Sequence, residues 1–173
     1  AKIGVSAPGS ATHLLLNTLL VQAGMKPEDV SVIGVGNTAG AVAAIRTGGE
    51  LQAIVNYDPV ITELEQSGDI RVVVDTRTAE GTRAIYKNEY VFLTVYAHAD
   101  FIEKRADAAQ ALVNGIVRAL VWMQTAKPEE MLAAVPEAYW KANRDLYLKT
   151  IAKGAGGFSR DGRITPAAVK TVY

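Results

Sequence analysis

In the first half of the chain, short apolar runs alternate with longer amphipathic stretches. The runs predict strands at 2–6, 30–35, 53–57 and 70–75. The stretches between them predict helices ending at Ala23, at Thr47 and near Ser67, each followed by glycine, as at Gly48-Gly49. This alternation is typical of a parallel sheet with helices on its faces. Roughly the first 80 residues are therefore predicted to form an α/β lobe.

The pattern changes after a polar stretch at 76–89. Tyr90–Ala97 has the composition of a strand, and beyond it the pattern is helical. Helices are predicted at 106–125, 128–135 and 136–153, with a last one opened by Thr165-Pro166. We place a domain boundary at this polar stretch, between residues 88 and 89. Because one strand with several helices does not complete a sheet domain, we expect further sequence before residue 1.

Composition narrows the classes of function. The 173 residues are 49% hydrophobic, and 18 Lys and Arg balance 18 Asp and Glu. A chain without net charge has no field that attracts nucleic acid, so no nucleic-acid partner is expected. Cysteine is absent, which excludes disulfides and thiolate nucleophiles. No apolar stretch approaches the ~20 residues of a membrane span, and no signal peptide opens the chain.

Polar residues follow the first predicted strand, at the turn from Ser6 to Thr12. We expect free backbone N–H groups and the positive end of a helix dipole at this turn, an arrangement that suits an anion or a polar ligand group. Gly9 permits close approach, and the hydroxyls of Ser10 and Thr12 can donate and accept hydrogen bonds. Capping of the helix by Ser10 alone is an equally weighted interpretation. The turn lacks the glycine-lysine ending of a nucleotide-binding loop.

The next two strands also end in polar turns, Gly36-Asn37-Thr38 and Asn56-Tyr57-Asp58. The carboxyl ends of parallel strands share one edge of the sheet, where ligands of such sheets bind. The two asparagines can donate and accept, and Tyr57 can cover a ligand. Asp58 fits an N-cap before Pro59 better than a ligand contact, although it remains a candidate.

In their order and spacing, these pieces resemble a known family. The segments at 2–13, 32–37 and 53–59 resemble the second lobe of the nitrate, sulfonate and taurine binding proteins, and they are similar to the thiamine-pyrimidine precursor binding proteins. Residues 91–97 and 159–165 look like the return to the first lobe. The resemblance implies a type II periplasmic-binding-protein-like α/β fold, with 1–88 as one complete α/β lobe and 89–173 as the return strand and C-terminal helices of the other.

The same resemblance implies a function. Members of the family are solute-binding components of bacterial ABC importers, which close around a small polar or anionic solute and deliver it to a permease in the membrane. They are periplasmic or extracellular and membrane-associated, and they carry no cofactor. A full member would contain the opening half of the first lobe, and a signal peptide, before residue 1. Which solute is bound stays open among nitrate, sulfonate, taurine and related molecules.

In the family the residues at these turns line the cleft. The predicted ligand-binding residues are Ser10, Thr12, His13, Asn37, Thr38, Asn56, Tyr57 and Asp58. His13 has a capping or solvated role as its alternative. The aromatic residues of the helical half are assigned to packing.

An enzyme is not expected. His13 and His98 stand beside no carboxylate or second histidine at a metal-ligand spacing, and no Ser-His-Asp order is visible. No catalytic residue and no metal ligand is therefore predicted. Two alternatives remain on the same fold. One is an enzyme similar to a pyrimidine-precursor synthase, against which the absence of cysteine argues, and the other is the effector-binding domain of a transcription regulator.

Overall fold

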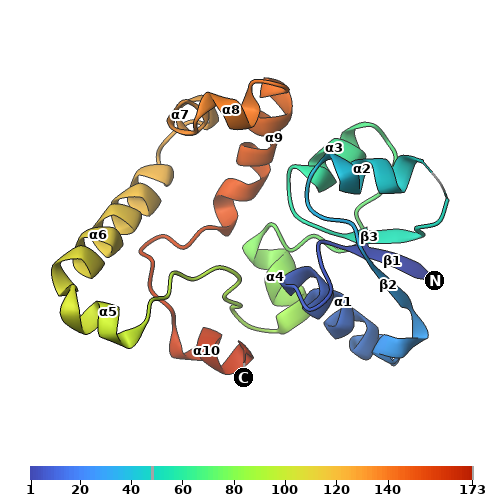
Figure 1. The fold of residues 1–173 in the computed structure, drawn as a ribbon, viewed down its shortest axis with the longest axis horizontal. Coiled ribbons are helices and arrows are strands. Elements are labelled where there is room, and N and C mark those ends of the chain that lie inside the picture. Colours follow the sequence, from blue (N-terminus) through green and yellow to red (C-terminus); the bar gives the residue numbers. More distant parts are fainter. Residues whose placement is uncertain (48, 173) are drawn as a thin grey trace. The chain divides into compact units, whose positions relative to one another are not determined.

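The computed structural model describes residues 1–47 and 49–172, so the predicted stop at Gly48 lies outside the described residues. The chain divides into two compact units, one from Ala1 to Val73 and one from Val74 onward (Figure 1). This division falls earlier in the chain than the boundary predicted between 88 and 89. The two units are described separately below.

The first unit is a three-stranded parallel sheet with helices on both faces. Its elements are β1 (Lys2–Val5), α1 (Ala11–Gln22), a 3-10 turn η1 (Pro27–Asp29), β2 (Ser31–Gly34), α2 (Ala39–Arg46), β3 (Ala53–Val55) and α3 (Val60–Gln66). The strand order is β2-β1-β3, and Ile3 is paired with Val32 on one side and with Ala53 on the other. The predicted α/β fold class is thereby confirmed.

Each face of this sheet has its own apolar core, because successive side chains of β1 point to opposite faces. Ile3 and Val5 pack with Leu16 and Leu20 of α1. On the other face, a core of α2 and α3 residues packs against Ile54 of β3 and Val35, which follows β2. Its buried members are Ala41, Val42, Val60 and Leu64. Gly4 faces this side, where a Cβ would lie 3.2 Å from Leu51.

Arg46 joins the end of α2 to α3 on the surface of this unit. Its Nε lies 2.7 Å from Oδ2 of Asp69, and its Nη1 lies 3.4 Å from Oε1 of Glu63. Hydrogen bonds from Ser67 and Arg46 lower the pKa of Asp69. The segment after α3 is therefore fixed to the first unit as far as Asp69.

The fourth predicted strand, at 70–75, does not form. The residues run without a ladder partner among the described residues, and Val73 is 80% exposed. An apolar β-branched run supplies strand propensity, but a strand also requires a neighbouring backbone edge to pair with. The sheet ends at the three-residue strand β3, and the run at 70–75 does not pair with the outer edge of that strand, so strand composition alone does not produce a strand here.

The second unit is helical, as predicted for the chain beyond about residue 98. Its elements are α4 (Ala79–Tyr86), α5 (Ala99–Lys104), α6 (Ala106–Met123), α7 (Pro128–Ala134), α8 (Glu137–Trp140), α9 (Arg144–Gly154), η2 (Ala155–Gly157) and α10 (Pro166–Val172). The short helix α4 was not predicted, because it lies in the polar stretch at 76–89 with little apolar periodicity, whereas α5 falls in the part predicted to be helical but was not assigned bounds of its own.

Two predictions for this unit are wrong. Residues 90–97 form no strand, because, as at 70–75, none of the described strands pairs with them. The single helix predicted at 136–153 is interrupted between α8 and α9. There Asn143 leaves the helical region at φ −155° and ψ 81°, and its side chain accepts a hydrogen bond from the Leu146 N–H at 3.0 Å, which begins a new helix.

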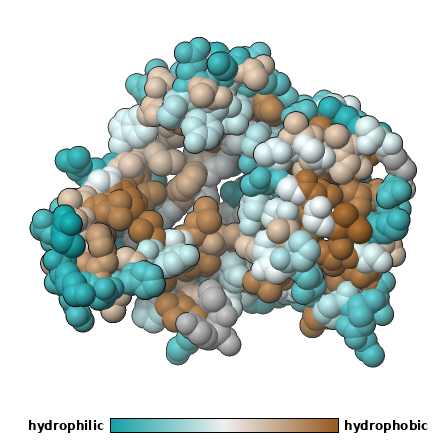
Figure 2. All heavy atoms as spheres, viewed as in Figure 1, coloured by the Kyte–Doolittle hydropathy of each residue, from teal (hydrophilic) through white to brown (hydrophobic). Residues whose placement is uncertain are grey.

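Within the second unit, α7 packs on α9, where Met131, Leu132 and Leu146 are buried. Trp140 Nε1 donates to the carbonyl of Val135 at 2.8 Å. No residue of α6 is buried, and Figure 2 shows apolar side chains gathered over this helix. None of the described helices combines the length and the hydropathy of a membrane span.

Candidate functional site

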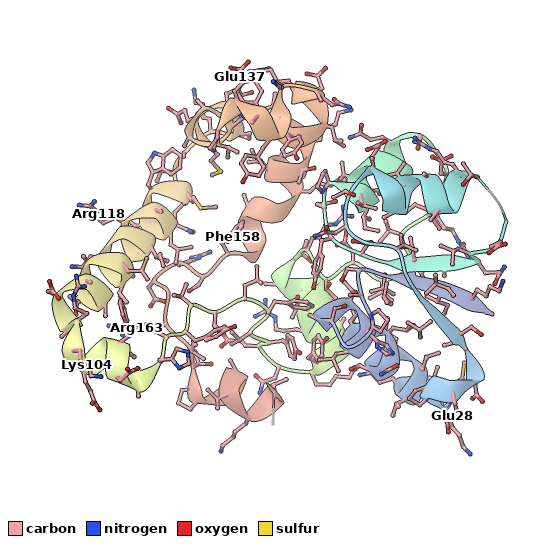
Figure 3. All side chains as sticks on the ribbon, in the orientation of Figure 1. Glu28, Lys104, Arg118, Glu137, Phe158 and Arg163 are labelled. Carbon is pink, nitrogen blue, oxygen red and sulfur yellow. The ribbon has the colours of Figure 1, made fainter. Side chains whose placement is uncertain are left out.

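The turns that follow β1, β2 and β3 meet at one edge of the sheet in the first unit (Figure 1). Beyond the paired strands, the N–H of Val35 donates to the Val5 carbonyl at 2.9 Å, and that of Gly36 donates to the Ser6 carbonyl at 3.0 Å. These bonds extend the pairing of β1 and β2 into their turns. Glu28 lies before β2, at the opposite end of that strand (Figure 3).

Three hydroxyl groups form a closed cluster at this edge. The Ser6 Oγ lies 3.0 Å from the Ser10 Oγ and 2.9 Å from the Thr12 Oγ1, and the latter two are 2.8 Å apart. The Thr12 Oγ1 also accepts the Ser6 backbone N–H at 2.9 Å. Thr12 is buried, whereas Ser6 and Ser10 are half-buried. Rotation of the two serine hydroxyls can therefore turn a donor or an acceptor toward a ligand.

The sequence predicted free backbone N–H groups at the start of α1, but several of these groups donate hydrogen bonds within the protein. The Gly9 N–H donates to Nδ1 of His13 at 2.9 Å, and the Ser10 N–H donates to the Ala7 carbonyl at 3.1 Å. The His13 N–H reaches the Ser10 Oγ at 3.4 Å, a long capping bond. Side-chain acceptors near the helix start satisfy donors that the sequence pattern alone left open.

Tyr57 lies against the same helix start. Burial raises the pKa of its phenol, and the nearby backbone N–H of Thr12 acts in the opposite direction. The side chain stays 36% exposed. The first turn of α1 contains no acidic residue, so no carboxylate on this turn offsets the positive end of the helix.

Asn56 and Asp58 flank Tyr57 and act on the backbone. The Asn56 Nδ2 donates to the Gly36 carbonyl at 2.8 Å, and its Oδ1 accepts the Tyr57 N–H at 2.9 Å. The Asp58 Oδ1 accepts the Thr62 N–H at 2.9 Å. The predicted cap is displaced by one residue, because Pro59 occupies the N-cap position and Asp58 bonds the helix from before it.

The remaining predicted residues are less closely joined to the cluster. Asn37 and Thr38 are exposed, and Thr38 occupies the N-cap of α2 without a capping bond from its side chain. His13 is connected to the turn through Gly9. The structure thus brings Ser10, Thr12 and Tyr57 together and sets Asn56 beside them.

Two residues of the cluster, Ser6 and Gly36, were absent from the predicted site. Ser6 contributes its hydroxyl and its carbonyl, and Gly36 contributes both of its backbone groups. The available signal was position, because Ser6 follows directly on β1 and Gly36 lies two residues after β2, at the edge where the turns gather. Gly36 also adopts φ +73°, which favours glycine.

A hollow of about 530 Å³ lies elsewhere on this unit, on the α2 side of the sheet. It is lined by Ile33, Val35, Ala44, Thr47, Glu50 and Leu51. Apolar side chains gather below α2 in Figure 2, in agreement with this lining. None of the predicted ligand-binding residues lines it. Among the described residues, no group of three or more acidic or histidine side chains is placed to hold a metal ion.

Known proteins similar to this chain place it in a family. The model of the NMT1-like family matches residues 1–136. A solved structure of a protein from Bordetella bronchiseptica RB50 is similar with a TM-score of 0.88 and 44% sequence identity, over 99% of this chain and 55% of that protein. The chain therefore spans little more than half the length of that relative. The comparison with curated proteins returned no match.

The family match covers the sheet, all three turns and most of the helical unit. The match supports the assignment of the chain as a ligand-binding protein, but it does not identify the ligand. The chain belongs to the NMT1-like family, a periplasmic-binding-protein-like family.

Proposed function

We propose that the protein captures a small polar or anionic solute and passes it to the membrane permease of an ABC importer, without changing the solute chemically. The observation that carries the proposal is the hydroxyl cluster of Ser6, Ser10 and Thr12 with Tyr57 beside it, at the sheet edge where ligands of parallel sheets bind. Family membership supports ligand binding. A periplasmic or extracellular, membrane-associated location belongs to the same proposal.

The chemistry of the cluster favours a ligand that accepts hydrogen bonds. Serine hydroxyls can donate to an oxyanion, and the helix start adds a favourable potential. Nitrate, sulfonates, taurine and carboxylates share such oxygens. Because a capture protein has no chemical step, the proposal needs no nucleophile, and the sequence contains no cysteine that could provide a thiolate.

Isothermal titration of the full chain with nitrate, taurine, methanesulfonate and an aminopyrimidine tests the proposal. One of them should bind, and Ser10→Ala should weaken its binding about ten- to a hundredfold, as expected for one hydrogen bond to a charged group. Thr78→Ala is the matched control, because Thr78 caps α4 in the second unit by accepting the Gly81 N–H at 3.0 Å. It should lower stability by about 1 kcal/mol and leave affinity unchanged.

A loss of stability without a loss of affinity would contradict the assignment of Ser10 to the ligand site. If Ser10→Ala lowers the free energy of unfolding while affinity stays within about twofold of the parent, Ser10 is only a cap. Absence of binding for all four solutes at millimolar concentration would reject a small oxyanion or pyrimidine as the ligand.

A further inference from the structure

The three hydroxyls of the cluster have a fixed order of donors and acceptors. The Ser6 Oγ donates to the Ser10 Oγ at 3.0 Å, whereas either oxygen can be the donor in the bonds that Thr12 makes to the two serines. A hydroxyl has one proton to donate and two lone pairs that accept. The direction of the first bond therefore determines the directions of the other two.

Each direction follows from a proton that is already used. Because the Ser6 proton is donated to Ser10, Thr12 is the donor in its 2.9 Å bond to the Ser6 Oγ. The Thr12 proton is then used as well, so Ser10 is the donor in its 2.8 Å bond to the Thr12 Oγ1. The three bonds form a closed ring that runs from Ser6 to Ser10, from Ser10 to Thr12 and from Thr12 back to Ser6.

Backbone N–H groups complete two of the three oxygens in this ring. The Thr12 Oγ1 also accepts the Ser6 N–H at 2.9 Å, and the Ser10 Oγ also accepts the His13 N–H at 3.4 Å. Both oxygens thus have two donors. In the described part of the chain, the Ser6 Oγ receives one donor, the Thr12 hydroxyl. One lone pair of the half-buried Ser6 therefore stays available to a ligand.

The Ser10 proton is the one that leaves the ring at the least cost. If it turns toward a ligand, the Thr12 Oγ1 keeps the Ser6 N–H as a partner. Thr12 is 2% exposed, so its own proton stays inside the ring. Turning the Ser6 proton outward would leave the Ser10 Oγ with only the long bond from His13. The cluster thus offers a donor at Ser10 and an acceptor at Ser6, on oxygens 3.0 Å apart.

We infer that Ser6 is a specificity-determining residue of the ligand site, whose available lone pair accepts a hydrogen bond from the ligand while Ser10 donates to a neighbouring oxygen of the same ligand. The inference rests on the proposed function and narrows its substrate class. The preferred ligand carries an N–H or O–H group beside an acceptor oxygen, as an amide, a sulfonamide or a protonated oxyacid does. An anion with lone pairs alone sets one of them against the Ser6 oxygen.

Isothermal titration of the full chain with methanesulfonate and methanesulfonamide tests the inference, because the two probes have nearly the same shape but only the sulfonamide has N–H donors. Ser6→Ala should weaken binding of methanesulfonamide about five- to tenfold and leave that of methanesulfonate within about twofold of the parent. Ser10→Ala should weaken binding of both. Ser159→Ala is the matched control and should change neither, because the Ser159 hydroxyl accepts the Gly162 N–H at 2.9 Å in the second unit.

Equal losses for both probes in Ser6→Ala, or no loss for either, would overturn the inference, because a purely structural role of Ser6 affects the two probes alike. Neutron diffraction of ligand-free crystals of the parent protein in heavy water gives a second readout that needs no variant. It should show the Ser6 deuterium directed at Ser10 and the Thr12 deuterium directed at Ser6, and the reverse order would also overturn the inference.

The neutron result distinguishes this inference from the proposed function. If neither these probes nor the solutes named above bind while the deuterium atoms lie as expected, the order of the ring is confirmed and the proposed function has failed. If a probe binds but the deuterium order is reversed, the proposed function stands and the role of Ser6 is rejected.

Discussion

Thr12 shows how a single residue decides the local structure of the candidate site. It is 2% exposed, and its hydroxyl satisfies the Ser6 N–H while bonding to two serine hydroxyls. A buried donor without a partner costs more than the bond contributes when it is made. Thr12 therefore supports the turn as well as the site, and its substitution should affect stability before it affects ligand affinity.

Thr12→Val keeps the branched shape but leaves the Ser6 N–H without its acceptor. We expect a loss of about 1 to 3 kcal/mol in the free energy of unfolding, measured by urea denaturation. Thr18→Val on the same helix is the control, because the Thr18 hydroxyl bonds only the Leu14 carbonyl of its own helix at 2.9 Å, at an exposed position. If Thr12→Val and Thr18→Val lower the free energy of unfolding equally, the buried hydroxyl cluster does not stabilise the protein more than an ordinary hydrogen bond within a helix.

At the scale of elements, close approach of backbone segments determines where two glycines are required. A Cβ on Gly81, in the first turn of α4, would lie within bonding distance of the Asp75 carbonyl oxygen, and one on Gly157 would lie 2.8 Å from the Arg77 carbonyl oxygen. The Thr82 hydroxyl also donates to the Thr76 carbonyl at 3.0 Å. The segment that enters the second unit is thus held against α4 and η2.

Gly81→Ala should destabilise the protein by at least about 1 to 3 kcal/mol, because the segment at Asp75 must move to admit a methyl group. Gly115→Ala is the opposite case. Gly115 lies within α6 with open space where its Cβ would be, so alanine should stabilise the helix by roughly 0.5 to 1 kcal/mol. Thermal melting of both variants measures the two effects, and a destabilising Gly115→Ala or a neutral Gly81→Ala would contradict the described packing.

At the scale of the whole molecule, the two compact units are connected by residues with few bonds. Asp69 is tied to Arg46 in the first unit, and Asp75 is tied to Arg77 in the second. Between them, Arg71, Val73 and Val74 are exposed. Segments with few hydrogen bonds and high exposure open locally at low cost in free energy.

Limited digestion with trypsin should therefore cut first after Arg71 and after Lys87, which precedes residues 88–97, a stretch that forms neither helix nor strand. Arg118 is the comparison within a helix, and Figure 3 shows it projecting outward from α6. It is accessible as a side chain, but its backbone is bonded within the helix, so cleavage there should be late. Mass spectrometry of early fragments measures the order, and early cleavage after Arg118 would contradict it.

The sequence by itself determined the α/β alternation, the positions of β1, β2 and β3 and the helical second half, because these depend on local periodicity. It also located the three polar turns and identified Ser10, Thr12, Asn56 and Tyr57 as members of one sheet edge, since parallel strands end on the same side. These features follow from residues close in sequence.

The tertiary structure alone decided which donors and acceptors were satisfied and which strand patterns became strands. Occupation of the Gly9 amide by His13 and of the Gly36 carbonyl by Asn56 depends on groups that are brought together in the fold. Likewise, 70–75 and 90–97 have strand composition, but none of the described strands pairs with them. Hydrogen bonding between distant segments is a property of their placement, and local pattern does not encode it.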